Sequence, residues 1–118
     1  MELIFKICGT QEWQAAESAG IYRGSSVDAR DGFIHFSTAE QLAETAQKHF
    51  GGRDDLVLVG VDPQALGEKL RFEPSRGGAL FPHLYSSLPL AAVRFVEVLP
   101  LAADGHHVLP LTRLRPSS

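Results

Sequence analysis

Two segments of the sequence concentrate side chains that can carry chemistry, residues 32–38 and residues 72–85. The first offers an imidazole and two hydroxyls, and the second offers a carboxylate, a guanidinium, an imidazole and a phenol. Imidazoles and carboxylates act as acids and bases near neutral pH, and guanidinium groups bind phosphate. The two segments together predict a surface that handles a small polar ligand.

The first segment predicts a short strand over residues 33–36. Alternation along this strand places Ile34 and Phe36 in the core, and His35 and Ser37 on the opposite face. A lone histidine at such a position often does no more than hydrogen-bond a neighbouring loop. The ligand-binding and the purely structural interpretations of His35 both remain open at this point.

A helix is expected to follow at once, because residues 37–40 read Ser-Thr-Ala-Glu, which is a capping-box pattern. Unpaired amides and the positive end of the dipole at a helix start attract phosphate and carboxylate groups. Ser37 and Thr38 are therefore predicted to bind a ligand anion beside His35.

The second segment supplies Glu73 as a candidate acid or base, with candidate ligand-binding residues Ser75, Arg76, His83 and Tyr85. Glycines and prolines interleave these residues and let backbone approach a ligand closely. A solvated loop without function is also rich in Gly, Pro and Ser, but it less often carries imidazole and aromatic groups together. Composition alone leaves these two interpretations evenly balanced.

Other chemistries have weaker signals. Neither His-x-x-x-His nor Cys-x-x-Cys occurs, so a metal site would need His35, Glu73 and His83 to converge through the fold. Phosphate-binding P-loop, dinucleotide and nucleophile-elbow motifs are absent from the sequence. Cys8 lies in an apolar strand, which favours a small buried side chain over a nucleophile.

The helices and strands that must position these residues are predicted from the spacing of their apolar residues. Thr10 is expected to cap the first helix and Gly20 to end it, and residues 21–31 are expected to form an exposed loop that presents Arg23 to a ligand. The predicted helices cover residues 11–19 and 37–50, and the predicted strands cover residues 3–7, 33–36, 56–61, 69–73, 92–99 and, weakly, 108–114. This order predicts an α+β fold.

Length, composition and net charge limit the class of protein to which this chain can belong. A chain of 118 residues with 44% hydrophobic and 21% charged residues predicts a single globular domain over residues 1–118, with residues 104–118 as a loosely attached tail or edge strand. The net charge of −3 gives no attraction to nucleic acid. A lone cysteine, no signal-like start and no long apolar run predict a cytoplasmic protein outside the membrane.

The chain resembles a bacterial family called domain of unknown function 952. The resemblance rests on IFKI with Trp13, IYRGSSVDARDGFIHFSTAEQ, DLVLVGVDP and LRFEPSRGGALFPHLYSSLPLAAV, and it covers nearly the whole chain to about Leu101.

The order of elements also resembles the small ADP-ribosyltransferase-like fold, in particular its RNA 2′-phosphotransferase branch. A strand reading Val-His-Leu-Ser in that branch is similar to residues 34–37, but Cys8 stands where the branch has a histidine that holds the ribose of NAD. The resemblance implies a split mixed or antiparallel sheet with two main helices, and a nucleotide-shaped cleft between the sheet halves.

Three functional hypotheses follow. The first is an ADP-ribosyltransferase-like transferase with NAD as candidate cofactor, in which Arg23 or Arg76 holds phosphates, His35 orients a ribose and Glu73 stabilises an oxocarbenium-like centre or acts as base. The second is a non-catalytic module that binds a nucleotide, a phosphorylated sugar or another small anion. The third is a metal-assisted hydrolase that uses His35, Glu73 and His83 as ligands.

Overall fold

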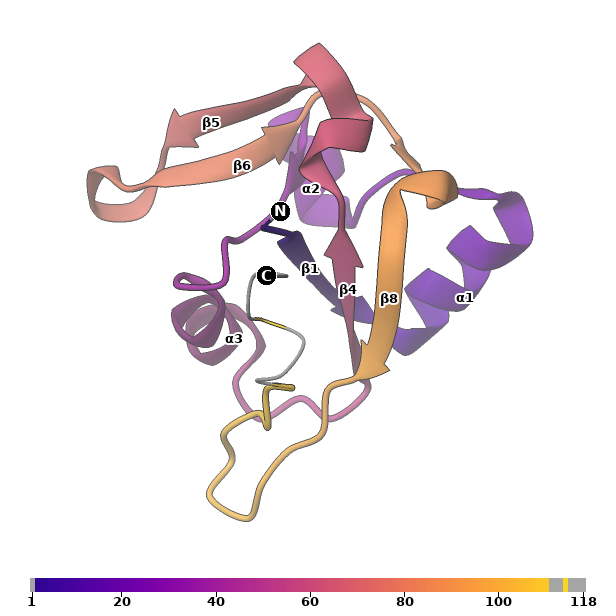
Figure 1. Ribbon diagram of the computed structural model, residues 1–118. Helices are drawn as coiled ribbons and strands as arrows, with labels where there is room; N and C mark the ends of the chain where they lie inside the picture. The colour runs from indigo at the N-terminus through magenta and orange to yellow at the C-terminus, as the bar shows by residue number, and fades with distance from the viewer. Residues whose placement is uncertain (1, 111–113, 115–118) are drawn as a thin grey trace.

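The computed structural model describes residues 2–110 and residue 114. Within this part the fold is α+β, as predicted, and its strands form two three-stranded antiparallel sheets and one two-stranded ribbon. Figure 1 shows the two larger sheets spread apart from each other. No helix in the described residues is long and apolar enough to cross a membrane.

The first sheet has the order β1 (Ile4–Gly9), β4 (Leu56–Val61) and β8 (Val93–Val98). Every residue of β4 is buried, which confirms the central position expected for an uninterrupted apolar run. One face packs against α1 (Thr10–Ala19) and the other against α3 (Leu42–Phe50), so the sheet separates two hydrophobic clusters (Figure 1).

The second sheet has the order β3 (Ile34–His35), β6 (Leu80–Leu84) and β5 (Leu70–Pro74). The β5–β6 hairpin turns through the 3-10 helix η2 (Arg76–Gly78), which lies in the segment singled out for chemistry. The ribbon pairs β2 (Ile21–Tyr22) with β7 (Leu88–Pro89).

Phe5 and Ser37 join the two sheets. Their backbones exchange two hydrogen bonds of 2.8 Å each, from the amide of each residue to the carbonyl of the other. Beyond this junction the sheets diverge, and the walls of a cleft are built from both of them.

The junction explains why the predicted helix start at Ser37 is wrong. The backbone amide and carbonyl of Ser37 are both committed to Phe5, so the chain is still extended there and α3 begins only at Leu42. The Ser37 hydroxyl hydrogen-bonds Thr45 at 2.9 Å instead of capping a helix. The predicted anion site at a helix start beside Ser37 therefore does not exist in this form.

Residues 21–31 are not the exposed loop that was expected. Besides β2, this segment forms α2 (Ser26–Asp31), which begins with a capping box: the Ser25 hydroxyl accepts from the Asp28 amide, and the Asp28 carboxylate accepts from the Ser25 amide. Tyr22 and Asp28 are both buried. The polar composition of this segment therefore concealed a short helix, which Ser25 and Asp28 cap.

The other boundaries agree more closely with expectation. Helix α1 ends at Gly20 in the left-handed conformation, as predicted, but Thr10 is its first residue and donates its hydroxyl to the Asp55 carbonyl. A 3-10 segment, η1 (Pro63–Lys69), follows β4, and a second one, η3 (Leu90–Ala92), leads into β8. The weak strand predicted over residues 108–114 is wrong for residues 108–110, which are not in a strand, and residues 111–113 lie outside the described residues.

Gly60 provides a test of the packing between β4 and β8. A Cβ atom at this position would lie 2.2 Å from the Phe95 ring, whereas a Cβ at Gly9 would meet nothing closer than 3.4 Å. We expect Gly60→Ala to lower the free energy of unfolding by about 1–3 kcal/mol through overpacking, and Gly9→Ala to change it much less. Urea unfolding of both variants measures the difference, and equal effects would contradict this packing.

Candidate functional site

A cleft of about 480 Å³ opens between β1, α2, α3 and the β3–β6 strand pair. His35 and His83 lie in its wall, and their backbones are directly paired across the β3–β6 ladder. The two rings lie 5.5 Å apart, centroid to centroid, in an edge-on arrangement. One pair of strands thus presents two imidazoles to one cavity.

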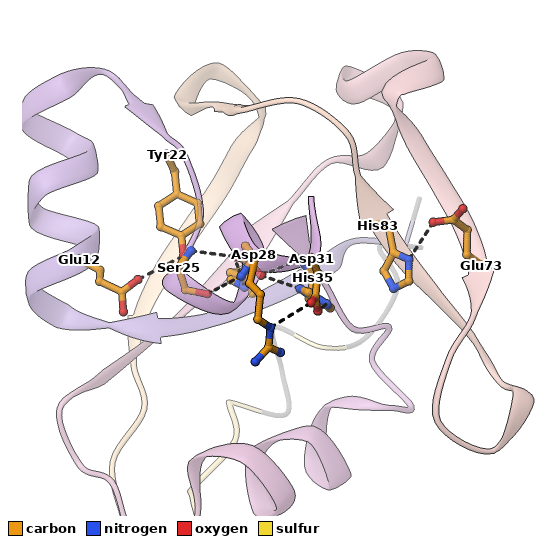
Figure 2. Close-up of polar contacts among 10 residues, drawn as sticks. Glu12, Tyr22, Ser25, Asp28, Asp31, His35, Glu73 and His83 are labelled. Carbon is orange, nitrogen blue, oxygen red and sulfur yellow. Dashed lines mark hydrogen bonds and ion pairs between the residues drawn. The ribbon is translucent and has the colours of Figure 1, made fainter. Parts of the chain in front are cut away.

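Asp28 is the polar centre of this site. Its carboxylate accepts hydrogen bonds from the Lys6 ammonium at 2.8 Å, the Ser25 amide at 2.8 Å, the His35 amide at 3.2 Å and the His35 ring nitrogen Nδ1 at 2.6 Å (Figure 2). The side chain is only 2% exposed. Burial by itself raises the pKa of Asp28, but hydrogen bonds from His35 and Lys6 outweigh it and hold the pKa below its ordinary range.

His35 is held between two carboxylates. Its Nδ1 contacts Asp28, and its Nε2 lies 3.0 Å from Asp31, which also pairs with Arg30 at 3.2 Å (Figure 2). Ionised carboxylates only accept hydrogen bonds, so the doubly protonated imidazolium satisfies both contacts. Through these two contacts the His35 ring ties β3 to α2.

His83 has a different environment. Its Nδ1 lies 2.9 Å from Oε1 of Glu73, and the same oxygen accepts the Tyr85 hydroxyl at 2.7 Å. Phe33 stacks on the His83 ring with centroids 4.1 Å apart. The side chain is 6% exposed, and its Nε2 is fully buried with no hydrogen-bond partner among the described residues.

The Glu73 carboxylate stays ionised in this arrangement. Hydrogen bonds from Tyr85 and His83 lower the pKa of Glu73, and the bond to Glu73 raises the pKa of Tyr85. An acceptor-only carboxylate places the mobile proton of a neutral His83 on Nδ1. The lone pair of Nε2 then accepts no hydrogen bond from the described residues.

The structure brings together four of the predicted residues. His35, Ser37, Ser75 and His83 all line the cleft, whereas Arg23 and Tyr85 line a smaller pocket of about 190 Å³ that has Phe33 in its wall.

The remaining predicted residues lie elsewhere. Glu73 lines neither cavity and reaches the cleft only through His83, and Thr38 donates its amide to the Gln41 side chain. The side chain of Arg76 is outside the part of the chain that the structure describes.

Several cleft residues were missed by the sequence interpretation, namely Lys6, Asp28, Arg30, Asp31 and Arg53. Two signals were present: a lysine within the apolar run of β1, and a Ser-x-x-Asp pattern over residues 25–28 that resembles a capping box. A buried charge in a strand requires a partner, and Asp28 is that partner.

Metal binding has no support in the geometry. Among residues 2–110 and residue 114, no group of three His, Cys, Asp or Glu side chains is placed to hold an ion. Glu73 engages Nδ1 of His83 directly, and His35 is engaged by Asp28 and Asp31. Of the three residues of the metal hypothesis, Glu73 and His83 therefore form one pair, whereas His35 is held by two other carboxylates.

Cys8 lines the cleft but is buried, as expected, and burial raises the pKa of its thiol from 9.0 to about 12. A pKa raised this far leaves about a thousandfold less thiolate, which is the reactive form. We expect alkylation by iodoacetamide at pH 8 to be slower by about that factor than in the urea-unfolded chain. Equal rates, followed by mass spectrometry, would contradict this environment.

The Lys6–Asp28 pair can be tested by a double-mutant cycle. Asp28→Asn leaves the Lys6 ammonium buried without its charged partner, so we expect a loss of about 3–5 kcal/mol in the free energy of unfolding. Lys6→Met combined with Asp28→Asn should cost clearly less than the sum of the single changes. Additive losses would show that the two groups do not interact.

The lowered pKa of Asp28 also predicts a pH dependence. The carboxylate stabilises the fold above the pKa of the unfolded chain, near 4, and this contribution is lost as the pH falls further. We expect the free energy of unfolding to drop between pH 4 and pH 2 more steeply in the native sequence than in Asp28→Asn. Parallel curves would exclude Asp28 as the source.

Comparison with known proteins identifies relatives of this chain. Protein CC0527 from Caulobacter crescentus has a crystal structure that matches with a TM-score of 0.89 at 49% identity, over 94% of this chain and 97% of that one. Its solution NMR structure matches with a TM-score of 0.81 at 51% identity, over 90% and 91%. No protein with a curated description matches. The family model described as protein of unknown function (DUF952) matches residues 7–96, and the chain therefore belongs to this family.

Proposed function

We propose that this protein binds a phosphorylated nucleotide or sugar in the cleft between its two sheets. The observation that carries the proposal is the convergence of His35 and His83 with the guanidinium groups of Arg30 and Arg53 on one cavity of about 480 Å³. A cavity of this size suits a small ligand, and convergent polar groups within an apolar wall are typical of such sites.

The walls offer surfaces for both parts of such a ligand. Phe5, Phe36, Phe50 and Phe81 contribute rings that can pack against a base or the apolar face of a sugar. Hydroxyls of Ser37 and Ser75 lie in the same lining and can hydrogen-bond the ligand.

The two arginines supply the positive charge for phosphate. Arg30 pairs with Asp31 at 3.2 Å and Arg53 with Asp55 at 3.3 Å, and both guanidinium groups are solvent-exposed at the cleft. Arginine binds phosphate oxygens in a bidentate manner, so both residues can exchange their surface ion pairs for a ligand. They take over the phosphate role first assigned to Arg23, Arg76 and a helix start.

The ADP-ribosyltransferase-like fold and activity form the second, more specific part of the proposal. Two sheet halves that diverge from one junction with a cleft between them agree with the split sheet of that fold. NAD is the corresponding cofactor, with His35 near its ribose and Glu73 acting through His83. Buried Cys8, in place of a histidine, favours the alternative of a binding module without transfer chemistry.

A ligand screen by thermal shift tests the binding step, which both alternatives share. We expect NAD, ADP-ribose or ribose 5-phosphate at millimolar concentration to raise the Tm, and Arg30→Gln combined with Arg53→Gln to remove most of the increase. Lys48→Gln is the control, because Lys48 is an exposed cation paired with Glu44 outside the cleft lining.

Each outcome of this screen leads to a different conclusion about the cleft. A Tm increase that the double arginine variant abolishes and the Lys48 variant keeps supports binding in the cleft. Stabilisation that survives the arginine changes would place the phosphate elsewhere. No stabilisation by any of the three ligands would refute the proposed function.

A further inference from the structure

We infer that the ligand of the cleft presents a hydroxyl group to Nε2 of His83, which accepts the hydrogen bond of that hydroxyl while Glu73 anchors Nδ1 of the same ring. This inference rests on the proposed function and names the part of the ligand that the site recognises. It also assigns Glu73 as a positioning residue rather than a group that touches substrate.

The direction of the hydrogen bonds around His83 carries the argument. Oε1 of Glu73 receives the Tyr85 hydroxyl at 2.7 Å and lies 2.9 Å from Nδ1 of His83. A carboxylate that already accepts one bond can accept a second but cannot donate, so Nδ1 bears a proton. In the neutral ring this leaves Nε2 as an acceptor, and its required partner is a donor.

The second ring nitrogen of His83, Nε2, is a buried polar atom whose hydrogen-bonding capacity is unused within residues 2–110 and 114. It is buried without a hydrogen-bond partner among the described residues, and Phe33 covers one face of the ring. Leaving a buried polar atom unpaired costs about 1–3 kcal/mol, and His83 lines the cleft. A ligand donor that reaches Nε2 recovers this cost, which makes the atom a specificity determinant.

The second histidine cannot take this role. Both ring nitrogens of His35 are already occupied by carboxylates, Nδ1 at 2.6 Å from Asp28 and Nε2 at 3.0 Å from Asp31. His35 therefore has neither a lone pair for a hydroxyl nor a free N–H for a phosphate. The cleft divides the ligand between Arg30 and Arg53, which can bind its phosphate, and His83, which can bind a hydroxyl.

This division selects a phosphorylated sugar, because that class carries phosphate and hydroxyl groups within a few bonds of each other. A pyrophosphate ion supplies only acceptors to a neutral Nε2 and would leave it unpaired. The Glu73 carboxylate holds the Nδ1 proton and thereby keeps Nε2 as the acceptor.

Nitrogen-15 NMR of the full chain tests the inference. Long-range proton–nitrogen spectra at pH 8 should show His83 with its proton on Nδ1 and a lone-pair-bearing Nε2. Saturating ADP-ribose should shift the Nε2 resonance of His83 strongly, and inorganic pyrophosphate should leave it in place.

A variant gives an independent measurement. His83→Phe keeps a ring beside Phe33 but removes the acceptor, so we expect the Kd for ADP-ribose to rise about tenfold or more. His106→Phe is the matched control, since His106 pairs with Asp104 at the surface outside the cleft lining. If the His83 variant does not fold, the spectra of the native sequence decide the question.

Each result has a distinct meaning. A proton on Nε2 of His83 in the free protein overturns the inference. So does a shift of the Nε2 resonance that is equally large with pyrophosphate. An Nε2 resonance that stays in place while ADP-ribose binds and stabilises the protein overturns it as well. In these three cases binding in the cleft survives. Failure of ADP-ribose to bind at all refutes the proposed function itself, and the inference falls with it.

Discussion

The buried carboxylate of Asp28 imposes the constraint on which the site depends. A charge that is 2% exposed must be neutralised and fully hydrogen-bonded, and Lys6, Ser25 and His35 meet this need from three different elements. The network therefore fixes β1, α2 and β3 relative to one another. Removing one partner would leave the other charge buried and unpaired, so these three elements are held in one arrangement.

Fixing these elements also fixes what each histidine can do. Asp28 and Asp31 occupy both ring nitrogens of His35. His83, its neighbour across the ladder, is anchored on Nδ1 by Glu73 and has no partner on Nε2 in the part of the chain that the structure describes. Two side chains of the same type, on paired residues of adjacent strands, thus have opposite hydrogen-bonding roles. The difference lies in their partners and not in the residues themselves.

Local patterns determined much of the framework. The apolar run of β4, the Gly20 stop of α1 and the polar–apolar alternation at His35 each depend on a few neighbouring residues, so their signals are visible in one dimension. The same holds for the family resemblance, which follows from matching stretches along residues 7–96. The two segments that were singled out do meet, through His35, Ser37, Ser75 and His83.

Long-range pairing decided the rest. The capping-box pattern at Ser37 does not start a helix, because the backbone of Ser37 forms two hydrogen bonds with Phe5, 32 positions away. The similar pattern at Ser25 does start a helix, α2, which was not predicted from the sequence. The partner of Lys6 lies 22 positions away, so only tertiary contact could reveal it. The sequence by itself determined which residue types and elements were available, and the tertiary structure decided which of their hydrogen-bonding groups stayed free, because local signals cannot specify partners distant in the chain.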